Sequence, residues 1–382
     1  MKKPMHRVLR FISLCIVSGV ALAAPRPLPD APSPDAASYV LMDFASGQVL
    51  TDKDADKRVE PASITKIMTS YIVFDELKQG RIALDDEVTV SQKAYEMGGS
   101  KMFIEVNKKV SVEDLLRGVV VASGNDASVA LAEFVAGSED TFASYMNQYA
   151  EELGLTNSHF VNATGWPAEN HYMSARDIAH LSHALIEDFP DYYDRYYHEK
   201  SFTYNGITQN NRNSLLWTDE TVDGIKTGHT ESAGFCLAAS ARREGMRLIS
   251  VVTGTRSDAA RKTANRALLE YGFRFFEPYK FYEDGAAISK MRVYKGSVTE
   301  VALKARGDVH VAVPRGQRDE LRTTAELPAV LMAPLSADEP VGTLKVSYGD
   351  KLLHQEPLYP AHAVEEGGVF RQIADEFMLL FK

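Results

Sequence analysis

Apolar residues recur at intervals of three and four over much of residues 63–190, which is the spacing of amphipathic helices. The first such run starts at Ser63 and ends before Gly80, a residue type that often terminates helices. Two later runs start at residues suited to cap a helix: Ser111, with Asp114 three positions on, and Ser174. The pattern predicts helices over residues 63–77, 111–123, 127–137, 139–154 and 174–189.

Short apolar runs lie on either side of this helical block. Residues 38–50 are typical of two strands around a Ser-Gly turn. Residues 224–228, 234–241 and 248–255 predict three strands at hairpin spacing, and residues 258–276 return to a helical pattern. One mixed sheet with helices packed on its faces accounts for this order, so the first domain is predicted to be α/β.

The pattern changes after residue 282, where short alternating segments are separated by turn residues. They predict a small all-β domain of roughly 80 residues, a size that can fold alone. The segments are 291–296, 298–305, 309–316, 321–328 and 342–349.

The C-terminus predicts an amphipathic helix, because Phe370, Ile373, Phe377, Leu380 and Phe381 fall on one side of it. Such a helix can lie in a membrane interface. Its polar side is not basic, so attraction to anionic lipid would be weak. A terminal helix docked on its own domain is the alternative.

The N-terminus predicts a signal peptide. A basic start, "MKKPMHR", precedes an apolar stretch, and Ala21-Leu22-Ala23 fits a cleavage signal, so we expect cleavage after Ala23 or Ala24. An uncleaved anchor is the alternative, but the apolar stretch is short for a spanning helix. The chain then divides into a signal peptide, a linker, the α/β domain, the all-β domain and the terminal helix: 1–24, 25–36, 37–282, 283–364 and 365–382.

Charge and cysteine content narrow the function classes. A formal net charge of −10 argues against nucleic acid as the main partner. Cys15 falls in the signal peptide, which leaves Cys236 alone in the exported chain, so no internal disulfide is expected. Cys236 lies in the apolar stretch "GFCLAAS" and is expected to be a buried, inert thiol.

Ser63 and Lys66 are the first candidates for chemistry, because residues three apart share a face of a helix. A serine hydroxyl is a poor nucleophile until a base takes its proton. A lysine can be that base when burial and a neighbouring cation lower its pKa. On its own the S-x-x-K pattern is weak, and Ser63 as an N-cap beside a solvated Lys66 would also explain it.

Two further motifs strengthen this interpretation. Ser123-Gly124-Asn125 falls where a predicted helix ends, so its hydroxyl and amide would project from a turn. Lys226-Thr227-Gly228 ends a predicted strand and offers a cation, a hydroxyl and a glycine that would let a ligand approach the backbone. A plain turn and a solvent-exposed strand end are the structural alternatives.

The set S-x-x-K, S-x-N and K-T-G is found in penicillin-binding proteins and class A β-lactamases. With "ASITK", "SGNDA", "DGIKTGHT" and "GFRFFE", a β domain and an amphipathic tail, the chain resembles the low-molecular-mass penicillin-binding proteins, which are D-alanyl-D-alanine carboxypeptidases. This resemblance covers nearly all of the mature chain. It implies a β-lactamase/transpeptidase-like fold for the first domain, no metal or other cofactor, and a periplasmic location at the outer face of the inner membrane, held there by the terminal helix.

The resemblance also implies a reaction. Ser63 would attack the carbonyl between two terminal D-alanines of a peptidoglycan stem pentapeptide, and Lys66 would accept its proton. Ser123 would relay a proton to the leaving D-alanine, with Lys226 supporting the relay. Water would release the acyl-enzyme, and β-lactams would be covalent inhibitors.

Five more residues would bind the substrate by the same resemblance. Asn125 would bond the peptide amide, and Thr227, beside Gly228, would bind the terminal carboxylate. The backbone N–H groups of Ser63 and His229 would form an oxyanion hole. Arg261, eleven residues before "GFRFF", would offer a fork of donors to the carboxylate, with a solvated helix charge as its alternative.

Three other functions are alternatives. A class A β-lactamase would need a glutamate for deacylation, but the stretch around Glu169 lacks the expected E-x-x-L-N arrangement, and the middle motif is S-G-N rather than S-D-N. An endopeptidase that cleaves cross-links is the second alternative. Relatives of that type usually lack the β domain, so the predicted β domain argues against it. A non-catalytic scaffold of the same fold would have no use for three intact motifs.

Overall fold

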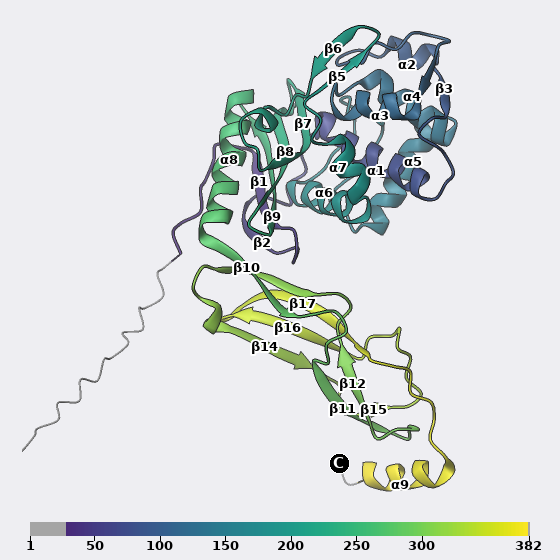
Figure 1. The fold of residues 1–382 in the computed structure, drawn as a ribbon, viewed down its shortest axis with the longest axis vertical. Coiled ribbons are helices and arrows are strands. Elements are labelled where there is room, and N and C mark those ends of the chain that lie inside the picture. The colour runs from purple at the N-terminus through teal and green to yellow at the C-terminus, as the bar shows by residue number, and fades with distance from the viewer. Residues whose placement is uncertain (1–27, 381–382) are drawn as a thin grey trace, which may run out of the picture.

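The computed structural model describes residues 28–380 of the chain. An α/β domain and a β domain follow one another along the long axis of the molecule, and helix α9 lies at the far end of the β domain (Figure 1). The predicted signal peptide and Phe381 lie outside the described residues.

A five-stranded sheet forms the centre of the first domain, in the strand order β2-β1-β9-β8-β7. It unites the two early and three late strands that the sequence predicts. All its pairings are antiparallel, and a parallel pair, β11 with β15, occurs in the second domain. The sheet strands are β1 (Ser38–Asp43), β2 (Val49–Lys53), β7 (Val222–Thr230), β8 (Gly234–Arg243) and β9 (Met246–Thr255).

Helices cover both faces of this sheet, as predicted. Helix α8 packs on one face, and α6 with the helical block covers the other. Ser111 and Ser174 cap α3 and α6 by accepting the backbone N–H groups of Asp114 and Asp177. The helices are α1 (Lys66–Lys78), α2 (Gln92–Glu96), α3 (Val112–Val120), α4 (Asn125–Ala136), α5 (Glu139–Glu152), α6 (Ala175–Asp188), α7 (Pro190–Tyr196) and α8 (Asp258–Phe275).

Helix α1 is the centre of the helical block. Most of its side chains are buried on all sides, from Lys66 to Phe74 without interruption, as expected of a core helix rather than an amphipathic surface helix. The predicted helix over residues 63–77 is therefore right in type and wrong at its start. Residues Ala62–Thr65 form a 3₁₀ turn, and Ser63 makes no capping bond.

Short peripheral elements are absent from the sequence prediction, because they lack a clear apolar period. They are the pair β3 (Glu87–Thr89) and β4 (Lys109–Ser111), the hairpin β5 (Ser201–Tyr204) and β6 (Ile207–Asn210), and helices α2 and α7.

The second domain consists of strands around its own apolar core, as the sequence predicts. Its larger sheet has the order β14-β16-β17-β12-β11-β15, and β10 pairs with β13. Because β10 belongs with this domain by pairing, we propose a domain boundary near residue 276 in place of 282. The strands are β10 (Phe276–Tyr282), β11 (Ser289–Tyr294), β12 (Glu300–Lys304), β13 (Val309–Pro314), β14 (Leu321–Glu326), β15 (Leu331–Met332), β16 (Gly342–Tyr348) and β17 (Lys351–Pro360).

Helix α9 (Val369–Leu379) lies against the β domain through one buried carboxylate. Asp375 is 2% exposed and accepts the backbone N–H of Lys295 at 2.7 Å and a guanidinium N–H of Arg292 at 3.1 Å. Large apolar side chains face outward: Val369, Phe370, Ile373, Phe377 and Leu380. In the described part of the chain, no helix has the length and apolar character needed to cross a membrane.

Candidate active site

The turn that carries Ser63 lies between strand β7 and the loop over residues 162–166, and two glycines permit this packing. A Cβ on Gly228 would meet the Pro61 carbonyl oxygen at 2.7 Å, and one on Gly165 would meet that of Ala62 at 1.8 Å. Gly165 also has φ +80°, a conformation that favours glycine. The sequence predicts that Gly228 lets a ligand approach. The structure shows instead that the protein's own Ser63 turn fills that space.

Lys66 is fully buried, and its amine contacts three oxygens. It bonds Ser63 Oγ at 2.9 Å, Asn125 Oδ1 at 2.7 Å and the Thr164 carbonyl at 2.6 Å. The last two oxygens can only accept. A neutral amine would therefore donate its two N–H bonds to them and direct its lone pair at the Ser63 hydroxyl.

The surroundings of Lys66 favour that neutral form. The pKa of Lys66 is lowered to about 7, with burial as the largest cause and Arg212 acting in the same direction. The negative charges of Asp126 and Glu139 act in the opposite direction. The amine is consequently poised to exchange a proton near neutral pH, as a general base requires.

A second serine–lysine pair lies beside the first. Ser123, in the loop between α3 and α4, accepts a hydrogen bond from Lys226 Nζ at 2.8 Å. Lys226 is buried in the middle of β7, not at the strand end that the sequence predicts. Burial lowers the pKa of Lys226 well below its ordinary value, and the nearby Lys66 and Arg212 lower it further.

Asn125 joins Lys66 to the wall of the cleft. Its amide nitrogen donates to the Gly98 carbonyl at 2.8 Å, and its backbone N–H donates to Ser100 O at 2.8 Å. A cleft of about 670 Å³ opens over Ser63 and Asn125, and the loop around Trp166 and the end of β7 line it. The lining residues are Ser63, Gly99, Ser100, Asn125, Thr164, Gly165, Trp166, Pro167, His229, Thr230, Glu231 and Ser232.

Thr227 and His229 lie on β7 beside this cleft. Thr227 is buried next to Lys226, whereas His229 is exposed and stacks on Phe235 with ring centroids 3.8 Å apart. His229 Nδ1 lies 3.1 Å from the Gly234 carbonyl. Because a carbonyl only accepts, that nitrogen carries the ring proton.

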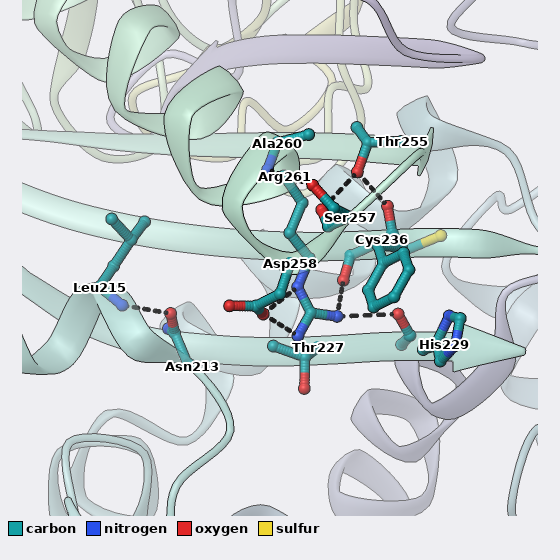
Figure 2. A network of polar contacts seen from close by, with 12 residues as sticks. Asn213, Leu215, Thr227, His229, Cys236, Thr255, Ser257, Asp258, Ala260 and Arg261 are labelled. Atoms are coloured by element: carbon teal, nitrogen blue, oxygen red, sulfur yellow. Dashed lines mark hydrogen bonds and ion pairs between the residues drawn. The ribbon is translucent and has the colours of Figure 1, made fainter.

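Arg261 reaches toward β7 from helix α8 (Figure 2). It is not among the residues that line the cleft. Its Nη1 donates to the carbonyls of Gly228 and Cys236 at 3.0 and 3.2 Å, and its Nε donates to Asp258 at 2.9 Å. The sequence predicts a free fork for a substrate carboxylate. In the structure, most of the fork bonds acceptors of the protein itself, with Asp258 one helical turn away, and carboxylate binding by Arg261 stays a prediction.

Several residues at the site carry no motif signal. Asp126 is buried next to Asn125, and Arg212 acts on both lysines from the segment after β6. His171 links the Ser63 turn to the neighbouring loop. Its Nδ1 accepts the Val161 N–H at 3.1 Å, so its Nε2 donates to Thr65 Oγ1 at 2.9 Å. Burial lowers the pKa of His171 to about 4 and keeps the ring neutral.

Two other predictions from the sequence can be compared with the structure. Cys236 is buried, as predicted, and burial raises the pKa of its thiol. Glu169, the glutamate considered for β-lactamase chemistry, is exposed and is not among the residues that line the cleft.

Comparison with known proteins gives matches over both domains. Residues 27–257 match the family model "D-alanyl-D-alanine carboxypeptidase", and residues 276–366 match "Penicillin-binding protein 5, C-terminal domain". D-alanyl-D-alanine carboxypeptidases DacC and DacA of Escherichia coli K12 are 45% and 42% identical, each covering 92–93% of this chain and 90% of their own. Penicillin-binding protein 5 of Haemophilus influenzae superimposes with a TM-score of 0.83 at 43% identity, covering 88% of this chain and 100% of its own.

The tight packing at Gly165 predicts that Gly165→Ala will displace the Ser63 turn. We expect acylation of Ser63 by a fluorescent penicillin to slow by about 100-fold, because small misplacements of reacting groups are costly. Gly137→Ala is the matched control: Gly137 has φ +78°, but a Cβ added there would meet no atom within 4 Å. It should lose about 1–2 kcal/mol of stability and keep its acylation rate. Equal acylation rates in the two variants would contradict the packing argument.

The pKa of Lys66 predicts the pH dependence of acylation. If neutral Lys66 is the base, the second-order rate with a fluorescent penicillin should rise with pH, with a midpoint near 7, and level off above it. Arg212 lowers that pKa, so Arg212→Gln should move the midpoint to higher pH. Stopped-flow acylation across pH 5–9 measures both. A midpoint that stays in place, or moves to lower pH, would count against Lys66 as the base.

Proposed function

The chain belongs to the D-alanyl-D-alanine carboxypeptidase family of serine hydrolases, and from this we propose that it removes the terminal D-alanine of peptidoglycan stem pentapeptides through an acyl-enzyme on Ser63. The observation that carries the proposal is the contact of Ser63 Oγ with the buried amine of Lys66, whose two other partners are obligate acceptors.

In the first step, Ser63 Oγ attacks the carbonyl carbon between the two D-alanines while its proton passes to the Lys66 lone pair. The tetrahedral intermediate places negative charge on the former carbonyl oxygen, which the backbone N–H groups of Ser63 and His229 stabilise. Preorganised donors of this kind typically contribute about 3–4 kcal/mol to the transition state.

In the second step, the bond to the leaving D-alanine breaks and its nitrogen gains a proton. Ser123, whose hydroxyl is held by Lys226, supplies it and regains a proton from the Lys66 ammonium by way of Lys226, which returns Lys66 to its neutral form. The low pKa of Lys226, caused first by burial, supports its taking part in this relay.

Water then attacks the ester carbonyl of the acyl-enzyme while neutral Lys66 accepts its proton, and Lys66 returns that proton to Ser63 Oγ as the ester bond breaks. A β-lactam ring reacts at the same serine but leaves a slowly hydrolysed ester, so β-lactams act as covalent inhibitors. Structure neighbours described in ampicillin- and cefotaxime-bound forms support this reactivity in related proteins.

Asn125 and Thr227 complete the substrate contacts in this proposal. Asn125 lines the cleft and bonds the peptide amide through the amide edge left free by Lys66 and Gly98. Thr227 on β7 binds the terminal carboxylate. Arg261, with Arg212, adds positive charge near Lys226, and in this proposal Arg261 contributes to the binding of that carboxylate.

We propose that the protein works in the periplasm and attaches to the outer face of the inner membrane through α9. Phe370, Leu380 and Val369 are 92%, 76% and 71% exposed, which is unusual for large apolar side chains in solution. Asp375, buried on the opposite side, would hold the helix with that apolar face outward.

The carboxypeptidase proposal predicts release of D-alanine from a stem pentapeptide by the purified protein, and complete loss of release in Ser63→Ala. Ser232→Ala is a suitable control, because Ser232 lines the same cleft and is not assigned a chemical role. It should keep activity within a few fold. Absence of release by the unmodified protein would favour the endopeptidase alternative, and a cross-linked dimer would be the next substrate.

The attachment proposal predicts that the protein will co-sediment with phospholipid vesicles, and that Phe370→Ser combined with Phe377→Ser will abolish this. Each apolar group removed from the interface weakens binding by about 1–3 kcal/mol. Leu352→Ser in β17 is the control, because Leu352 is an exposed large apolar residue, at 48%, that lies outside α9. Binding that survives the double substitution would overturn attachment by this helix.

A further inference from the structure

Asp126 is a buried carboxylate that has no role in the proposed reaction. It is 0% exposed and lies at the start of α4, directly after Asn125. Its Oδ1 accepts the backbone N–H groups of Met102 and Ala127, both at 2.9 Å. Its Oδ2 accepts those of Phe103 at 2.9 Å and Ile104 at 3.3 Å. All four donors are backbone groups, so the carboxylate acts as a clamp on the chain.

Three of these donors belong to the segment over residues 98–104, which lines the cleft through Gly99 and Ser100 and is called the cleft wall below. The same segment provides the carbonyls of Gly98 and Ser100 that hold the side chain and backbone of Asn125. Asn125 Oδ1 in turn holds the amine of Lys66. The Asp126 carboxylate therefore fixes the position of the cleft wall relative to Asn125, which holds the Lys66 amine.

The charge of Asp126 also acts on Lys66 directly. The charged groups that influence Lys66 are Asp126 and Glu139 on the negative side and Arg212 and Lys226 on the positive side. Among the two carboxylates, Asp126 has the stronger effect and has no side-chain cation bonded to it, whereas Glu139 is paired with Lys93 at 2.8 Å.

We propose that Asp126 is a positioning residue that couples the order of the cleft wall over residues 98–104 to the protonation of Lys66. When the wall is in place, its N–H groups hold the carboxylate close to the amine. A substrate that packs on the wall would thus strengthen the arrangement that holds Asn125, and through it the Lys66 amine, in place. This inference rests on the proposed role of Lys66 as the base for Ser63.

The test is Asp126→Asn in the full protein. The amide oxygen can still accept from Met102 and Ala127, but the NH₂ group would face the N–H groups of Phe103 and Ile104. Hydrogen exchange at those two amides should quicken at least about fivefold. Removing the negative charge should lower the pKa of Lys66. The acid limb, which is the rise of the Ser63 acylation rate with pH, should therefore move to lower pH by about half a unit or more. The plateau rate should fall by about tenfold.

Glu139→Gln is the matched control, since it removes a negative charge that acts on Lys66 and leaves residues 98–104 untouched. It should move the acid limb in the same direction by a smaller amount, with unchanged exchange at Phe103 and Ile104. Faster exchange in Asp126→Asn without a shift of the limb would overturn the coupling, as would a shift without faster exchange.

The two proposals can fail separately. If the unmodified protein is not acylated at Ser63, the proposed function fails, and the exchange measurement alone then decides whether Asp126 orders the wall. If acylation occurs normally and Asp126→Asn behaves like the unmodified protein in both measurements, only the inference about Asp126 is overturned.

Discussion

The burial of the Lys66 amine is the constraint on which the site depends. An isolated ammonium in a protein interior costs far more free energy than a domain can spare, so the group must be surrounded by acceptors or lose its proton. Here both occur: two carbonyl-type oxygens fix the direction of the N–H bonds, and the pKa is lowered to about 7. In the neutral form of Lys66, the lone pair is then what remains to face Ser63 Oγ. The all-round burial of α1 follows from the same need, because a helix at the surface could not keep this amine dry.

The acceptors come from segments far apart in the sequence, and close backbone packing brings them together. Gly165 and Gly228 let the Thr164 loop and strand β7 approach the Ser63 turn from two sides, to distances that any side chain would prevent. Arg261, which reaches β7 from helix α8 (Figure 2), then donates a hydrogen bond to the Gly228 carbonyl. The positions of these backbones, more than the identity of the catalytic side chains, decide whether the amine and the hydroxyl meet.

The sequence predicted the motif residues and the main elements, since both depend on local pattern. The strands of the central sheet, the caps at Ser111 and Ser174, and the clustering of the S-x-x-K, S-x-N and K-T-G residues were all accessible from spacing and recognised motifs. The helix start at Lys66 was not, because a 3₁₀ turn and a first helical turn have almost the same apolar pattern. The role of Asp126 could not be predicted, because its four partners are backbone N–H groups and every residue type except proline has one.

Arg261 and α9 show where residue type and position give opposite information. Arg261 has the chemistry of a carboxylate receptor, and in the structure its guanidinium bonds Asp258, three residues away. In α9 the spacing of apolar residues shows that one face is hydrophobic, but it does not show which face contacts the β domain. Asp375 is a charged residue, a type that usually faces solvent. Here it is buried against the β domain, so the side of the helix that carries it faces inward. Because a buried carboxylate must keep its donors, it fixes the rotation of the helix more firmly than its apolar residues could. The outward apolar face then follows from satisfying one charge.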